Sequence, residues 1–365
     1  MAVQLMMLRL KLAFQCICKV MAVIFRKIIL IIYFFSLTSC QIGYYLSSAK
    51  NQFQMMSSRH SIDQALQEKN LTEEQRRKIL ISQKARFFAF EKLRLKETKN
   101  YSTFIDLKRP YVTWVVHAAE KWKMKNYEWS YPVVGNMPYK GFFNEQDAKA
   151  EAFEMSEKGY DTYVRGVSAY STLGWFQDSL LSSMLRYKEH DLVNTVIHEI
   201  VHTTIYIKNN ADFNEKLAVF IGAKGSEIFY TDLEGPHSKT LKLIKDENED
   251  DILFAKFVTD EIKKLDVWYS EKPDQLNTAA RDARLDSILT QFSTVLKPQL
   301  KTNLYLKFEK EKMNNARLGL YKTYMENLDQ FEILYKKLGN DLLKFIDAVK
   351  TLEKSDDPEA DLRKL

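Results

Sequence analysis

The sequence predicts a mainly helical α+β protein, and three observations support this prediction. Glycine and proline are scarce, with 11 and 7 in 365 residues, so tight turns are few. Segments rich in valine, threonine and aromatic residues, as in strands, fall between residues 110 and 176. From Asp178 to the end, helical patterns dominate. This order predicts a small sheet embedded in helices.

The first forty residues have the features of a bacterial lipoprotein signal peptide. The stretch RKIILIIYFFSLTSC, residues 26–40, has a basic start and an apolar run of roughly ten residues, which is too short to span a bilayer comfortably. Its last four residues resemble the lipobox, in which the cysteine receives the lipid. We therefore expect residues 1–40 to be a lipoprotein signal peptide with Cys40 as the lipidated residue and Met21 as an alternative start. An uncleaved signal anchor is the alternative.

This signal places the protein in the cell envelope, lipid-anchored to the outer membrane and facing the periplasm. All three cysteines lie in residues 1–40, so the mature chain keeps only an acylated Cys40 and forms no disulfide. The same residues carry five of the 54 basic residues and no acidic one, which leaves 49 basic against 48 acidic residues in the remainder. A nearly neutral body gives no indication of a nucleic-acid partner.

The elements follow in a clear order along the chain. Residues 41–60 are predicted to be a polar tether, residues 61–235 to hold helices and the small sheet, and residues 236–365 to be helical. A capping-box pattern from Thr72 to Gln75 opens a helix that is predicted to run to about residue 98. The segment RPYVTWVVHAA (109–119) is predicted to be a strand or a buried helix, and YPVVGNMPYKGFF (131–143) is predicted to be strand and turn. A helix is predicted in NEQDAKAEAFEMSEKG (144–159), ending at Gly159. A strand is predicted in YDTYVRGVSAYSTLGWF (160–176), and a loop in YTDLEGPHS (230–238).

The stretch DLVNTVIHEIVHTTIYIKN, residues 191–209, places two of the six histidines four residues apart with a glutamate between them. In a helix that is apolar on most sides, and therefore buried, His198 and His202 stack on one face beside Glu199. This is the HExxH geometry, in which two imidazoles bind Zn²⁺ and the glutamate is the general base. The alternative is two core histidines bonded to backbone carbonyls. It leaves a glutamate buried without a partner, which is costly.

A catalytic zinc needs a third protein ligand and one open position. The metzincin pattern requires glycine and histidine where this chain has Ile205 and Lys208, so that subclass is excluded. The remaining downstream candidates are Asp212, Glu215, Glu227, Asp232, Glu234 and His237.

Glu215 is the favoured third ligand, with a solvated helix glutamate as the alternative. A second helix after a turn at residues 209–210 would place it on one face with Ala218, Val219 and Gly222, and these small residues let the two helices approach closely. Its carboxylate is then expected within roughly 4 Å of both imidazole nitrogens. Asp212 is expected at the N-cap of that helix, with its side chain occupied by backbone amides.

Several stretches occur together in the order typical of a bacterial family of putative aminopeptidases, which look like gluzincin-type zinc peptidases. They are DLKRPYVTWVVHAA, YPVVGNMPYKGFF, YVRGVSAYSTLGWFQDSLLSSMLRY, HEIVHTTIYIKNNADFNEKLAVFIG and NNARLGLYKTY, so the resemblance covers roughly residues 70–350. It implies a zincin-like core with a small sheet next to the HExxH helix. It also implies His198, His202 and Glu215 as the ligands of one Zn²⁺ and Glu199 as the catalytic base. Aminopeptidase activity follows only as an expectation, because the family's name itself rests on the metal motif.

Two further segments are candidates for contact with substrate. The segment just upstream of the HExxH helix is expected to pair with an extended peptide as an exposed edge strand; an internal strand with paired hydroxyls is the alternative. Its residues are Ser168, Ala169, Tyr170, Ser171, Thr172 and Gly174. Near the C-terminus, Asn314, Arg317, Tyr321 and Tyr324 share a helix face, on which a tyrosine is suited to stabilise an oxyanion. Tyr321, Tyr324 and Tyr170 are the candidates, whereas Arg317 is favoured as a surface or interdomain residue.

Together these features predict a zinc-dependent envelope peptidase that uses a metal-activated water, with Glu199 as general base. The helical region 236–365 is expected to complete the cleft. One alternative is a non-catalytic envelope lipoprotein with a structural or binding zinc site, which has no use for the base. Another is a zinc amidase or endopeptidase that acts on peptidoglycan peptides. The expected partners are a peptide substrate and the membrane, while the oligomeric state is left open.

Overall fold

Five stretches of the chain are described by the structure, which is a computed structural model: residues 43–131, 135–169, 177–271, 277–325 and 328–365. The side chains of residues 323–325 lie outside the described part. The chain divides into a first unit that ends at Ser57 and a second unit that covers Ser58–Leu365. The described part of the first unit is a helix over residues 43–57, so this portion of the predicted tether is helical.

The second unit begins with a small mixed sheet and the long helix α3. The sheet has the order β1–β2–β8, and the elements of this part are β1 (His60–Ser61), α2 (Ile62–Leu66), α3 (Glu73–Glu91), β2 (Thr103–Ile105) and β8 (Leu180–Leu181). The predicted capping box is confirmed, because Thr72 and Gln75 exchange both hydrogen bonds.

The predicted end of α3 near residue 98 is wrong. The helix ends at Glu91, and Arg94 then adopts a left-handed conformation with φ 52°. This turn directs Leu93 and Leu95 into the core, where they are 2% and 3% exposed. Burial of two leucines therefore outweighs continuation of the helix.

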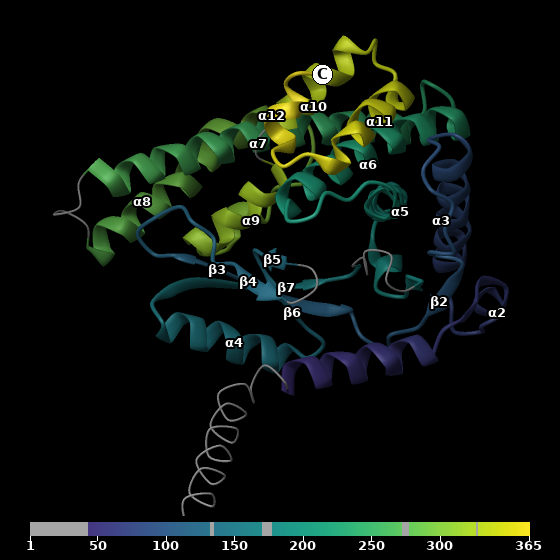
Figure 1. The fold of residues 1–365 in the computed structure, drawn as a ribbon, viewed down its shortest axis with the longest axis horizontal. Helices are drawn as coiled ribbons and strands as arrows, with labels where there is room; N and C mark the ends of the chain where they lie inside the picture. The colour runs from purple at the N-terminus through teal and green to yellow at the C-terminus, as the bar shows by residue number, and fades with distance from the viewer. Residues whose placement is uncertain (1–42, 132–134, 170–176, 272–276, 326–327) are drawn as a thin grey trace, which may run out of the picture. The chain divides into compact units, whose positions relative to one another are not determined.

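The central sheet lies between two helices (Figure 1). It has the order β6–β3–β7 with antiparallel pairing, and its elements are β3 (Thr113–Glu120), β6 (Lys140–Phe142) and β7 (Tyr160–Val167). Helix α4 (Glu145–Glu157) covers one face and α9 (Asn315–Met325) covers the other. Residues 115–119 of β3 are buried on both faces for this reason, which explains why their sequence fits a strand or a buried helix equally well.

The segments around this sheet follow their predictions. Strands β4 (Trp129–Tyr131) and β5 (Gly135–Met137) pair antiparallel, and β4 begins two residues before the predicted strand-and-turn segment 131–143. Helix α4 starts after the N-cap Asn144 and is followed by Gly159 with φ 88°, as predicted.

The remainder of the second unit is helical, which confirms the mainly helical α+β class. Its α-helices are α5 (Glu189–Thr204), α6 (Ala211–Glu234), α7 (Lys239–Glu271), α8 (Thr278–Gln291), α10 (Leu328–Lys337), α11 (Leu342–Lys350) and α12 (Pro358–Leu362). Its shorter helical segments are η1 (Met184–Arg186), η3 (Phe292–Leu296), η4 (Lys297–Gln299), η5 (Phe308–Lys310) and η6 (Thr351–Lys354). Among the described residues, no helix is both long and apolar enough to cross a membrane.

The predicted loop over residues 230–238 is wrong in its first half. Helix α6 continues to Glu234, because Phe229 and Tyr230 are buried and hold its last turns in the core. The helix stops only at Gly235, whose φ of 88° favours glycine.

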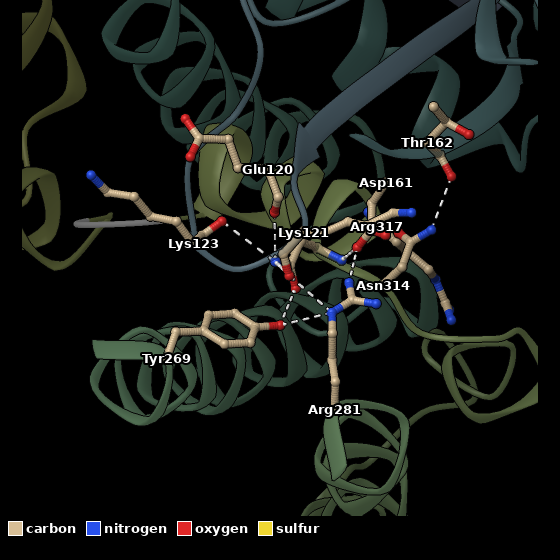
Figure 2. Close-up of polar contacts among 10 residues, drawn as sticks. Glu120, Lys121, Lys123, Asp161, Thr162, Tyr269, Arg281, Asn314 and Arg317 are labelled. Atoms are coloured by element: carbon tan, nitrogen blue, oxygen red, sulfur yellow. Dashed lines mark hydrogen bonds and ion pairs between the residues drawn. The ribbon is translucent and has the colours of Figure 1, made fainter. Parts of the chain in front are cut away.

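A buried network of hydrogen bonds and an ion pair links α7, α8 and α9 to the central sheet (Figure 2). Arg281 of α8 forms an ion pair with Asp161 of β7. Asn315, at the start of α9, donates its backbone N–H to the same carboxylate at 2.9 Å and its side-chain amide to Glu120 O at 2.8 Å. Tyr269 of α7 donates to Asn315 Oδ1 at 2.9 Å. Because each buried group has a partner, the network fixes α9 against the sheet.

Candidate metal centre

Helix α5 carries the two histidines and is buried on most of its surface. Six of its side chains are fully buried: Leu192, Val193, Val196, Ile197, Ile200 and Val201. Packing on so many sides fixes the rotation of the helix, and with it the direction of its polar residues. His198 Nε2 and His202 Nε2 lie 3.2 Å apart, with their rings at 85° to each other.

A short turn brings the chain from α5 into α6. Asn209 takes a left-handed conformation with φ 62°, and Asn210 is the N-cap of α6. The side chain of Asn214, which is 2% exposed, accepts from Ile207 N at 2.9 Å and donates to Ile207 O at 2.7 Å. Asn214 therefore ties the turn to the first turn of α6 and fixes the position of the next residue, Glu215.

The two helices pack closely against each other at Gly222. A Cβ atom added there would lie 2.4 Å from Asn194 Oδ1 and 3.4 Å from His198 Cβ. Ala218, one turn earlier on α6, is fully buried. The small-residue face predicted from the sequence is therefore the face that packs on α5, and it brings Glu215 within reach of the histidines.

His198, His202 and Glu215 converge on one point. Glu215 Oε2 lies 3.5 Å from His198 Nε2, and Glu215 Oε1 lies 3.7 Å from His202 Nε2. The three side chains are 15%, 5% and 17% exposed, so the group is mostly shielded but reaches the surface. One ligand atom from each lies within 4.8 Å of the others.

These distances fit a tetrahedral zinc site. Bonds of about 2.0–2.1 Å from a tetrahedral zinc put neighbouring ligand atoms about 3.3 Å apart. The separations of 3.2, 3.5 and 3.7 Å are close to that value without any movement of the chain. Two imidazoles and one carboxylate are also the donor set of many catalytic zinc sites, which leave a fourth position open.

The electrostatics of the group favour a cation between the histidines and the glutamate. Burial by itself would raise the pKa of Glu215, but His202 and His198 outweigh it and lower that pKa. Burial by itself would lower the pKa of His202, but the Glu215 carboxylate outweighs it and raises that pKa. A metal ion at this point competes with the proton for the same lone pairs.

Glu199 differs from Glu215 in its surroundings. It is 8% exposed, and burial raises its pKa above the ordinary value, although His198 and His202 act against this. Within the described residues its Oε2 atom has no hydrogen-bond partner. A carboxylate with a raised pKa and a free oxygen has the properties required of a general base.

Two tyrosines near Glu199 were missed by the sequence analysis. Burial, and then the charge of Glu199, raises the pKa of the Tyr101 hydroxyl. Burial also raises the pKa of Tyr187, with Glu199 contributing and a hydrogen bond with Ser168 opposing. Tyr101 is 1% exposed and has φ 60°. No local pattern could have revealed these residues, because their electrostatic interaction with Glu199 arises only through the tertiary fold.

The expected role of Asp212 as N-cap is wrong. Asn210 occupies that position and Asp212 lies in the first turn of α6, because the helix starts one residue before Asp212. Among the described residues, neither Asp212 nor the other downstream candidates join the two histidines in a possible metal-binding group. Glu227, for example, accepts from Asn248 Nδ2 at 2.6 Å.

The remaining predicted site residues have different settings. Tyr321 packs its ring against Phe254 and Phe308, at 5.2 and 5.6 Å, and within the described residues none of its ring contacts is with a histidine of the group. Arg317 is not a surface residue: it is 2% exposed and donates to the backbone oxygens of Phe308 and Glu311, because it closes the loop before α9.

Part of the predicted substrate segment can be located. Ser168 is buried, and its backbone oxygen accepts from the Ser183 hydroxyl at 2.6 Å. Ala169 follows it outside any strand and is half-buried. The other residues of the prediction, Tyr170, Ser171, Thr172 and Gly174, together with the side chain of Tyr324, lie outside the described residues.

A second polar group lies at the start of α5. His190 Nε2 is 2.7 Å from Glu247 Oε2 and 3.4 Å from Asp191 Oδ1, while Lys188 Nζ is 2.6 Å from Glu247 Oε1. Because a lysine already neutralises the glutamate, this group is an ion-pair network that joins α5 to α7.

One family model matches this chain over residues 43–364, and its description is "Putative aminopeptidase". No curated protein and no solved structure matches the chain.

Proposed function

Since the chain belongs to the putative aminopeptidase family, we propose that it is a zinc-dependent peptidase with a zincin-like core. The observation that supports this proposal best is the convergence of His198, His202 and Glu215 at tetrahedral spacing. When bound there, zinc supplies a Lewis acid that polarises the scissile carbonyl and lowers the pKa of a water molecule.

The chain's own residues supply the proton transfers in this proposal. Glu199 takes the proton from the attacking water and delivers it to the leaving amine. Its position between the two histidines of α5 places it beside the ligands without making it one of them.

The outer edge of strand β7 supports a peptide as substrate. Strand β7 lies at the edge of its sheet, and its register turns the backbone groups of Thr162, Val164 and Gly166 away from β3. Asn314 donates to Thr162 O at 2.9 Å, whereas no hydrogen bond within the described part of the chain uses the outward groups of Val164 and Gly166. An extended peptide can pair with such an edge, and β7 leads directly to Ser168.

This function is tested by digestion of peptides, first with the metal removed from the protein and then with it restored. The purified protein should carry about one zinc per chain and cleave members of a peptide mixture. Dialysis against a chelator should abolish cleavage, and added zinc should restore it. N-terminally acetylated peptides in the mixture show whether a free amine is required. Cleavage that survives metal removal contradicts the zinc mechanism, and zinc binding without any cleavage favours a structural site.

We also propose that the protein is a lipoprotein of the cell envelope, and Cys40→Ala should release it from the membrane fraction. The acylated cysteine is the attachment that remains once the signal is removed. Membrane fractionation of both forms, with intact mass of the wild-type protein, is the measurement. A mass that retains residues 21–39 would contradict lipidation and favour a signal anchor.

A further inference from the structure

The helix over residues 43–57 displays an apolar stripe to the solvent. Leu46 and Phe53 are 66% and 75% exposed, and Tyr45 is 39% exposed. Together with Ala49, which is also exposed, they fall at helical spacing on one face. The half-buried residues of the same helix are Tyr44, Ser48, Asn51, Gln52, Met55 and Met56. Exposed apolar side chains gathered on one face of a helix mark a contact surface.

The charge of this part of the chain fits an anionic surface. The first acidic residue of the whole sequence is Asp63. Between Cys40 and Asp63 the chain carries Lys50 and Arg59 and no acidic residue. Positive charge next to exposed apolar side chains is the combination that holds a helix at the interface of an anionic bilayer.

The described part of this helix also lies close in sequence to the proposed attachment point. Only residues 41 and 42 separate it from Cys40. Three peptide units span at most about 11 Å, which keeps the start of the helix at the depth of the headgroups.

A second copy of the chain fits the stripe less well. A stable interface needs about 800 Å² from each partner, and four side chains on one face of a short helix supply less than that.

We propose that the helix over residues 43–57 lies along the membrane surface, with Tyr45, Leu46, Ala49 and Phe53 in the boundary between headgroups and acyl chains. This inference rests on the proposed membrane attachment and is independent of peptidase activity. The helix is then a second, reversible contact that adds to the lipid.

The experiment compares two adjacent positions in the full chain. Phe53→Cys and Gln54→Cys are each made with Cys16→Ala and Cys18→Ala, labelled with an environment-sensitive fluorophore, and reconstituted into vesicles of phosphatidylcholine and phosphatidylglycerol. Gln54 is the matched control, because it is exposed on the polar face of the same helix. Quenching by acrylamide should be at least about threefold weaker at position 53 than at position 54, and a lipid-borne quencher should act more strongly at 53. Omitting phosphatidylglycerol should reduce the difference.

Each other outcome contradicts the inference in a distinct way. Equal quenching at both positions, in protein that floats with the vesicles, overturns the surface helix and leaves the attachment intact. Protection that grows with protein density shows that a second copy covers the stripe. Protein that does not float overturns the attachment and the helix contact together, while the zinc and digestion results stand apart from both.

Discussion

Replacement of Glu199 by glutamine is expected to lower turnover about 100-fold or more, with folding and zinc content unchanged. Glutamine has the same shape, so it fits the buried position of Glu199 without a change of volume. The amide cannot accept the proton from water, and general-base catalysis is lost. Because Glu199 is not one of the three converging donor atoms, the metal remains.

Steady-state kinetics, zinc analysis and thermal unfolding of the same preparations are the measurements. Glu189→Gln is the matched control, since it lies on the same helix and pairs with Arg77 at 2.6 Å near the surface. The control should keep wild-type turnover. A Glu199→Gln variant that cleaves peptides at the wild-type rate would remove Glu199 from the mechanism.

Replacement of Glu215 by alanine is expected to weaken zinc binding by at least about 100-fold, since even the partners of metal ligands contribute 10–100-fold. His198 and His202 come from one helix and supply two corners of a tetrahedron, so the third must come from another element. Glu215 is the carboxylate that lies within 3.7 Å of both Nε2 atoms.

Competition with a chromogenic chelator measures the zinc affinity of each variant. Asp212→Ala provides the control, since it removes a carboxylate three residues earlier in the same helix and should keep the wild-type affinity. Zinc binding that survives Glu215→Ala but fails in Asp212→Ala would reverse the assignment of the third ligand.

Local rules predicted the parts of this fold that depend on neighbouring residues. The capping box at Thr72 and the glycine after α4 could both be predicted, because each depends on interactions between residues only a few positions apart. The closeness of Glu215 to the histidines could be predicted from the sequence for a related reason. When a short turn joins two helices and a small-residue face at Gly222 lets them pack closely, the two helices can pack against each other in only a few ways.

The errors arose where distant packing decided the local structure. The turn after α3 and the extra helical turn before Gly235 both depend on burial of Leu93, Leu95, Phe229 and Tyr230 in a core assembled from remote segments. The proximity of Tyr101 to Glu199 has the same origin. Interactions of this kind leave no period or motif in the sequence near the residue concerned.

The two hydrogen bonds between Asn214 and Ile207 have a consequence for the free energy of metal binding. Hydrogen bonds and helix packing within the chain hold the donor residues in place. The entropy of ordering these side chains is therefore lost during folding, and almost none of the metal's binding free energy is used for it. For the zinc proposed here, we therefore expect metal exchange and chain folding to be separate equilibria, unlike in a zinc finger. The protein is expected to release the ion, remain folded and take up another.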